Sequence, residues 1–225
     1  MAAQRKLTGF YTGLVAIAVI GAGALWLVRR SGQGTGPQVV DPAPAVTPGT
    51  FQGYVQGTDS APVTIIEYAD FECPACAQFA VLTGPDIKRR LVATGRVRWI
   101  FRDFPLEGHR NSMPAHLAAA CAFEQGRFWE MHDQLYFNHR RWVMESRPQR
   151  RIRELAAAIG VDQGRFNECL ESARYQDRIL ATRQIGIERG VSSTPTFEVN
   201  NLRVTGSIGF DSLRALVDRL SPPRP

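Results

Sequence analysis

The 225-residue sequence lacks the repeated ligand motifs of a structural zinc site. It has one C-x-x-C pair, Cys73 and Cys76, but no second C-x-x-C and no H-x(3–5)-H to complete four tetrahedral ligands. The four histidines are spread along the chain, without cysteine or carboxylate partners at ligand spacing. We therefore predict no metal site, and we expect the histidines to lie at the surface or to pack in the core.

Lysine is nearly absent, with 2 lysines and 25 arginines against 21 acidic residues, and the net charge is +6. Six of the arginines fall within residues 140–153. No aromatic platform or recognition helix accompanies this charge, so we predict no nucleic-acid binding. We interpret the arginine-rich stretch as a solvated helix and loop surface. A basic face for an anionic membrane surface or partner is the alternative.

One long uncharged apolar run, residues 7–28, lies near the N-terminus, with two basic residues on each side. Its 22 residues are enough to cross a bilayer as a helix. We therefore predict a signal anchor over residues 1–30 that attaches the chain to a membrane as a single-pass protein. A signal peptide cleaved near Ala22-Gly23-Ala24 is the alternative.

Residues 31–57 are rich in glycine, proline, threonine and serine. A segment of this composition buries too little apolar surface to become ordered, so we predict a flexible linker. Phe51 and Tyr54 are candidates for the start of an edge strand. The remaining residues, 58–220, are long enough for one globular domain.

A buried strand followed by a helix carries the cysteine pair. Val63–Ala69 is almost continuously apolar and β-branched, which suits a central strand covered on both faces. Pro74 suits the first position of a helix, so Cys73 lies at the N-cap over unpaired backbone N–H groups. The helix dipole stabilises a thiolate there, and the thiolate is the species that attacks disulfides. Cys76 follows on the same helix face, where it can close or release a bond with Cys73.

The predicted strand contains one acidic residue, Glu67, six positions before Cys73. An exposed position at a sheet edge is one interpretation of Glu67, and burial beneath the cysteine pair is the other. Burial would raise the pKa of Glu67 and suit this carboxyl group to proton transfer. We favour the buried position.

The rest of the chain predicts a strand, a block of helices and a closing hairpin. Residues 96–102 alternate between apolar and polar, as in a second strand of the sheet. Residues 111–190 have helical periodicity, and Gly126 and Gly160 end two of the five predicted helices. A strand pair with an Asn200-Asn201 turn follows, and a last amphipathic helix completes the chain.

Four segments resemble the thioredoxin superfamily, and most closely its DsbA-like, membrane-anchored branch. The matching pieces are Ala61-Pro62-Val63, Asp70-Phe71-x-Cys73-Pro74-x-Cys76, Phe128-Trp129-x-Met131-His132 and Thr194-Pro195. The resemblance implies an α/β thioredoxin fold with an inserted α-helical domain at about residues 111–190.

The resemblance also implies roles for single residues. Cys73 and Cys76 would be the redox-active pair, and Glu67 would lie beneath it and exchange a proton with the inner cysteine. The peptide bond before Pro195 would be cis. Thr194 would offer its backbone N–H and C=O to an extended segment of a substrate, as in β-strand addition.

Cys121 and Cys169 fall on inward-facing stripes of the helical block. The residues alone leave three possibilities open, namely free buried cysteines, a structural disulfide or a second redox pair. A bridge would close a loop of 47 intervening residues, which is worth about 4 kcal/mol in the chain-entropy model. The resemblance favours the structural disulfide, because some extracytoplasmic members carry one in the helical insertion.

Together these features predict a membrane-anchored, extracytoplasmic or periplasmic protein-disulfide oxidoreductase that introduces disulfides into secreted or membrane proteins. The direction of transfer stays open, because Pro74-Ala75 differs from the Pro-His of the best-known oxidases and the Gly-Pro of thioredoxins. A reductase or isomerase, including one for cytochrome maturation, is the alternative, and a Cu(I) carrier is a further one. We expect a monomer without a cofactor, with cysteine-containing protein substrates and a membrane partner that restores its redox state.

Overall fold

Residues 36–43 and 51–222 are described by the computed structural model. The anchor predicted over residues 1–30 lies outside these ranges and stays a prediction. Within them, no helix is both long and apolar enough to span a bilayer. The fold below is that of the unit beginning at Pro37.

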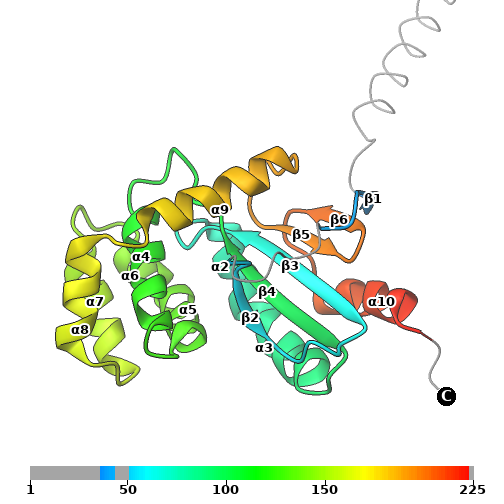
Figure 1. The fold of residues 1–225 in the computed structure, drawn as a ribbon, viewed down its shortest axis with the longest axis horizontal. Coiled ribbons are helices and arrows are strands. Elements are labelled where there is room, and N and C mark those ends of the chain that lie inside the picture. The colour runs from blue at the N-terminus through cyan, green and yellow to red at the C-terminus, as the bar shows by residue number, and fades with distance from the viewer. Residues whose placement is uncertain (1–35, 44–50, 223–225) are drawn as a thin grey trace, which may run out of the picture. The chain divides into compact units, whose positions relative to one another are not determined.

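A mixed six-stranded sheet forms the centre of this unit (Figure 1). Its strands are β1 (Gln38–Val39), β2 (Tyr54–Gln56), β3 (Val63–Ala69), β4 (Val97–Asp103), β5 (Thr196–Val199) and β6 (Leu202–Thr205). The order across the sheet is β1-β6-β5-β3-β4-β2. β3 and β4 run parallel, and all other neighbours run antiparallel. The predicted central position of β3 is therefore confirmed.

The sheet begins earlier in the chain than the linker prediction allows. β1 and β2 both lie within residues 31–57. β1 pairs with β6, and β2 pairs with β4, where Tyr54 lies opposite Phe101. The edge strand expected to start at Phe51 or Tyr54 is confirmed by β2, which lies at the edge of the sheet. The prediction of a flexible linker is wrong for β1, because its order comes from backbone pairing with β6 and not from apolar composition. Tyr54 is also fully buried and stacks on Phe128.

Helices lie against both faces of the sheet and form a block at one end of it (Figure 1). The helices are α2 (Pro74–Leu82), α3 (Gly84–Ile87), the π-helix η1 (Lys88–Val92), α4 (Ser112–Phe123), α5 (Phe128–Phe137), α6 (His139–Trp142), α7 (Gln149–Ala158), α8 (Gln163–Ser172), α9 (Gln176–Glu188) and α10 (Phe210–Leu220). α4 to α9 occupy the place in the chain where the helical insertion was expected, between β4 and β5.

Local sequence signals end and begin these helices. α2 gives way to α3 at Gly84-Pro85, because proline lacks an N–H and its ring clashes with the preceding helical turn. Gly126 and Gly160 follow α4 and α7 with φ of 70° and 73°, a conformation that suits glycine after a helix. Asp162 starts α8 by accepting a hydrogen bond of 2.8 Å from the backbone N–H of Arg165.

Apolar layers cover the two faces of the sheet. On one face, Phe79 of α2 and side chains of η1 and α10 pack with Trp99 of β4. On the other face, α9 lies over Tyr68 and Phe104. Gly186 permits this close approach, since a Cβ at that position would lie 2.8 Å from the Phe104 ring.

A third apolar core fills the helical block and extends to the cysteine pair. It includes Cys121 and Cys169 together with Phe71 and Cys76. The segment that carries the C-x-x-C motif is thus packed against the helical insertion, so the insertion helps to hold the motif in place.

Candidate active site

Cys73 lies at the N-cap of α2, as predicted. Its backbone is extended (φ −70°, ψ 122°), and Pro74 follows at the first helical position. The backbone N–H of Cys73 donates to the Asp70 carbonyl oxygen at 3.1 Å. Cys73 is 6% exposed, Cys76 is completely buried, and both are free thiols. Cys73 thus keeps a small exposed fraction, whereas Cys76, further along the same helix, has none.

The pKa values of the two thiols are shifted in opposite directions. The Cys73 pKa is lowered most by a hydrogen bond from Cys76. Burial raises this pKa, but hydrogen bonds from the Thr194 side chain and from the backbone N–H groups of Cys76 and Ala75 add to the lowering, and the pKa falls to about 5. Burial, followed by the neighbouring Cys73, raises the pKa of Cys76 well above its usual value. At neutral pH Cys73 is a thiolate and Cys76 a thiol.

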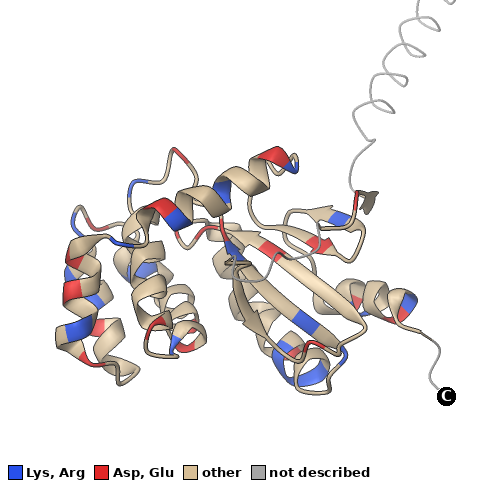
Figure 2. Cartoon of the chain, viewed as in Figure 1, with Lys and Arg blue, Asp and Glu red and all other residues tan. Residues whose placement is uncertain are grey.

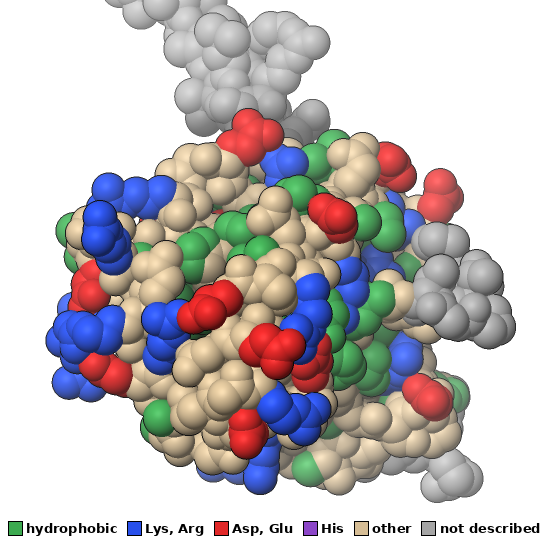
Figure 3. All heavy atoms as spheres, turned by 60° about the vertical axis from the view of Figure 1, so that its left-hand side comes forward, with side chains coloured by type: hydrophobic (Ala, Val, Ile, Leu, Met, Phe, Trp, Pro, Cys, Tyr) green, Lys and Arg blue, Asp and Glu red, His purple; other side chains and the backbone are tan. Residues whose placement is uncertain are grey.

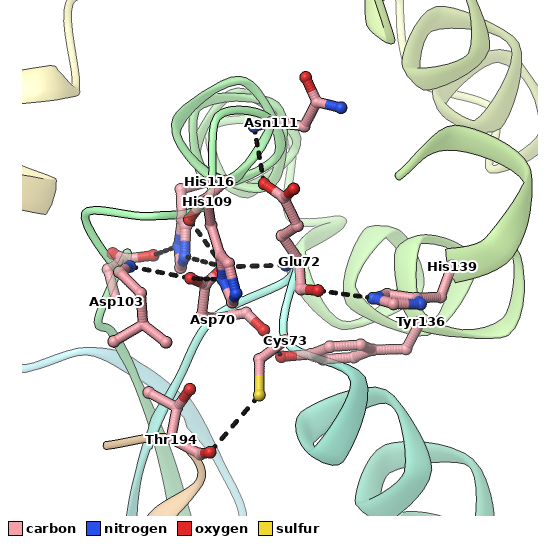
Figure 4. Close-up of polar contacts among 12 residues, drawn as sticks. Asp70, Glu72, Cys73, Asp103, His109, Asn111, His116, Tyr136, His139 and Thr194 are labelled. Atoms are coloured by element: carbon pink, nitrogen blue, oxygen red, sulfur yellow. Dashed lines mark hydrogen bonds and ion pairs between the residues drawn. The ribbon is translucent and has the colours of Figure 1, made fainter. Parts of the chain in front are cut away.

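The proline loop from the far end of the chain reaches Cys73. The Thr194–Pro195 peptide bond is cis, as expected. Cys73 Sγ lies 3.4 Å from the Thr194 carbonyl oxygen (Figure 4). The backbone of the proline loop and a reactive sulfur are thus held side by side, although 121 positions separate them in the sequence.

Glu67 is fully buried in β3, as favoured above. Its Oε2 accepts a hydrogen bond of 3.0 Å from Trp99 Nε1, whereas Oε1 has no partner among the described residues. Burial raises the Glu67 pKa to about 8, and the Trp99 hydrogen bond and Lys88 oppose the rise only in part. The carboxyl group is therefore protonated and neutral at pH 7, and only its ionised form would raise the Cys76 pKa further by charge repulsion.

Glu67→Gln is expected to stabilise the reduced protein in a pH-dependent way. The native state keeps a proton on Glu67 that the unfolded chain releases between pH 4.5 and about 8, so wild-type stability falls as pH rises through this window. Glutamine does not titrate, and the variant should gain about 3 kcal/mol over wild type at pH 7 and almost nothing at pH 4. Urea unfolding at both pH values measures this; an equal difference at the two values would contradict it.

A polar network that the sequence analysis did not predict supports the segment before Cys73. Asp70 is buried and accepts hydrogen bonds from Ser112 Oγ at 2.6 Å and from the backbone N–H of Leu106 at 2.8 Å. His109 Nδ1 lies 2.8 Å from Asp70 Oδ2 (Figure 4). Burial raises the Asp70 pKa, but the hydrogen bonds and the charge of His116 outweigh it and lower the pKa to about 2.

His116 extends this network into the core. Its Nδ1 lies 2.6 Å from Asp103 Oδ1, and its Nε2 lies 3.8 Å from Asp70 Oδ1. Burial opposes a charge on His116, but the two carboxylates together raise its pKa to about 9. His116 is fully buried, in agreement with the expected surface or core position, and folding places it between two carboxylates. No group of metal ligands occurs among the residues described here.

Further hydrogen bonds hold the backbone around Cys73. The Tyr136 hydroxyl donates to the Asp70 carbonyl oxygen at 3.3 Å, and His139 Nε2 lies 2.8 Å from the Glu72 carbonyl oxygen (Figure 4). The Glu72 carboxylate accepts a 2.6 Å hydrogen bond from the backbone N–H of Asn111. Asp70 and Glu72 lie in the recognised segment before Cys73. Their partners here, Asn111, Tyr136 and His139, come from the insertion, and no local pattern marks them.

Cys121 and Cys169 form a disulfide between α4 and α8, so the predicted pairing is present. Both cysteines are fully buried in the core of the helical block. The structure thus separates the four cysteines into one oxidised pair and one reduced pair.

Comparison with known proteins agrees with this architecture. A thioredoxin family model matches residues 50–219. "Probable disulfide bond formation protein D" of Bacillus anthracis is 28% identical over 169 residues, which cover 72% of this chain and 76% of that protein. "Na(+)/H(+) antiporter NhaA 3" of Salinispora tropica is 39% identical over 165 residues, covering 73% of this chain but only 24% of the antiporter.

Solved structures share the fold. Alpha-DsbA1 of Wolbachia pipientis has a TM-score of 0.67 at 23% identity, covering 74% of this chain and 89% of that one. BdbD of Bacillus subtilis, in its oxidised form, has a TM-score of 0.64 at 22% identity, and the match covers 74% of this chain and 91% of BdbD. The fold is that of DsbA-like proteins with a C-x-x-C site at a helix N-terminus. The chain belongs to the thioredoxin family.

Proposed function

We propose that this chain is an extracytoplasmic protein-disulfide oxidoreductase that donates the Cys73–Cys76 disulfide to cysteine-containing proteins. The observation that carries the proposal is the Cys73 sulfur at the N-cap of α2, with its pKa lowered to about 5 and the Thr194 carbonyl 3.4 Å away. A stabilised thiolate favours the reduced form of the pair, and such a pair is an oxidant. The name of the Bacillus anthracis relative supports this class of reaction.

Exchange would proceed in two steps. A substrate thiolate attacks Cys73 Sγ of the oxidised pair, forming a mixed disulfide and releasing Cys76 as a thiolate. Because Cys76 is buried and its thiol pKa is raised, it takes up a proton, which the protonated Glu67 carboxyl can supply. A second substrate thiolate then attacks the substrate sulfur, and Cys73 leaves as the low-pKa thiolate. The substrate loses two electrons and the enzyme pair gains them.

The Thr194–Pro195 loop would align the substrate. Thr194 precedes β5, and its carbonyl oxygen faces Cys73 (Figure 4). An extended substrate segment can pair with this backbone, which brings its cysteine to Cys73. A membrane partner would then reoxidise the enzyme, and the predicted anchor would keep the domain close to that partner. The transport named for the Salinispora relative is not proposed, because the match covers 24% of that protein.

The reduction potential of the Cys73–Cys76 pair tests the direction. The full chain is equilibrated in glutathione buffers, and alkylation with mass analysis follows this pair separately from Cys121 and Cys169. A value around −120 mV, as in DsbA, is expected for an oxidase. A value around −270 mV, as in thioredoxin, would overturn this direction and indicate a reductase.

A further inference from the structure

A groove extends from the redox pair along α2. One wall is formed by residues of α2, beginning at Pro74, and the other by residues 136–141 at the end of α5 and the start of α6. Its volume is about 530 Å³. Pro74 directly follows Cys73, so one end of the groove lies at the residue next to the reactive cysteine.

Two large apolar side chains line this groove and remain exposed. Leu82 of α2 is 67% exposed and Phe137 of α5 is 58% exposed. Neither is needed for the cores described above, because both face solvent. An apolar side chain of a bound segment could cover them, which would remove this surface from water.

The charge of the groove has one sign. Its lining includes Arg140, Arg141 and His139 but no aspartate or glutamate. Both arginines are exposed, and within the described part of the chain neither forms an ion pair. Three of the four later arginines of the same stretch pair with acids, namely Arg150 with Glu154, Arg151 with Glu145 and Glu154, and Arg153 with Glu171. Arg147, which does not line the groove, forms no ion pair with any described residue.

This contrast divides the arginine-rich stretch of the sequence. α7 and α8 carry both basic and acidic residues (Figure 2), and the face drawn in Figure 3 likewise mixes the two signs. That part fits the expected solvated surface. Arg140 and Arg141 differ, because they lie beside an apolar groove that begins at the reactive cysteine.

The groove and the proline loop flank the reactive sulfur. In the view of Figure 4, Thr194 lies to one side of Cys73, and Tyr136 and His139, which line the groove, lie to the other. A polypeptide held with its cysteine at Cys73 would contact the loop with residues on one side of that cysteine. Residues on the other side would reach the groove.

We propose that this groove selects substrates by binding the segment beside the reacting cysteine, with a preference for a large apolar side chain followed by acidic ones. The inference rests on the proposed oxidoreductase function and adds the class of polypeptide that reacts fastest. The apolar residue covers Leu82 and Phe137, and the acidic residues approach Arg140 and Arg141. Charge complementarity of this kind acts mainly on association rates.

The test compares rates of oxidation by the full chain in its disulfide form. The substrates are dithiothreitol and three dithiol peptides that differ only beside one cysteine, carrying Leu-Asp-Asp, Leu-Lys-Lys or Ser-Ser-Ser. At low salt we expect the acidic peptide to react about 10-fold faster than the basic one, and the ratio to shrink in 0.5 M salt. Phe137→Ser should reduce the advantage of the acidic leucine peptide over the serine peptide.

The variant R140E/R141E should reverse the preference between acidic and basic peptides while leaving the rate with dithiothreitol unchanged. R165E/R219E changes the net charge equally at exposed positions on α8 and α10, so it serves as the matched control and should keep the preference. Equal rates for the peptides, or equal effects of both double variants, would overturn the groove proposal alone. A disulfide that oxidises neither dithiothreitol nor any peptide would overturn the proposed function and this inference with it.

Discussion

Cys73→Ser is expected to lower the rate of disulfide donation to background, a loss of at least about 10³-fold. Serine cannot form the disulfide with Cys76 that a substrate thiolate attacks, and it provides no sulfur to leave as the thiolate that Cys73, with its pKa of about 5, becomes. The remaining Cys76 cannot substitute, because it is fully buried and its pKa is raised. Oxidative refolding of a reduced disulfide protein, followed by the recovered activity, measures the loss.

Cys76→Ser is the informative partner of this variant. It keeps the reactive Cys73 but removes the sulfur that resolves the mixed disulfide. When Cys76→Ser is mixed with a substrate disulfide, a stable one-to-one adduct on Cys73 should accumulate and be visible by mass. If Cys73→Ser formed the same adduct, or if Cys76→Ser formed none, the assignment of attacking and resolving cysteine would be wrong.

Removing the disulfide of the helical block with Cys121→Ala/Cys169→Ala is expected to lower the free energy of unfolding by about 4 kcal/mol. The bond joins residues 48 positions apart, and its loss restores the chain entropy of that loop in the unfolded state. For a domain of this size, the expected fall in Tm is roughly 10 °C.

The unfolding measurement is made by guanidinium titration on the Cys73→Ser/Cys76→Ser background, so that no free thiol can exchange with the bond. The same background with Cys121 and Cys169 intact is the control. In the otherwise unchanged protein, the alanine pair should still oxidise dithiothreitol, because the redox pair is separate from this bond. A loss of stability below about 1 kcal/mol would show that the bridge does not constrain the fold, which would favour the redox alternative.

Local signals made much of the fold predictable. The apolar strand Val63–Ala69, with Pro74 after it, predicted β3, the start of α2 and the N-cap position of Cys73, and the structure confirms all three. Gly126 and Gly160 end helices at the expected places. These features depend on one residue and its near neighbours, so a single sequence contains their cause.

Features that depend on a neighbouring strand were predicted less well. β1 and β2 lie in the range that was assigned to a linker from its composition. Pairing with β6 and β4 orders them, and composition does not indicate which strands pair. The burial of Glu67 was favoured but left open, since one acid in an apolar strand is compatible with an edge or a core. Its neighbours β4 and β5 decide the matter.

The sequence by itself determined which atoms can react: a C-x-x-C pair at a helix N-terminus, an acid in the preceding strand and a Thr-Pro loop far along the chain. Only the tertiary structure decided their chemistry. Folding brings Thr194 to Cys73, surrounds Asp70 with donors from the helical insertion and buries His116 between two carboxylates. Acidity at such a site depends on distance and burial in space, and neither is a local property of the chain.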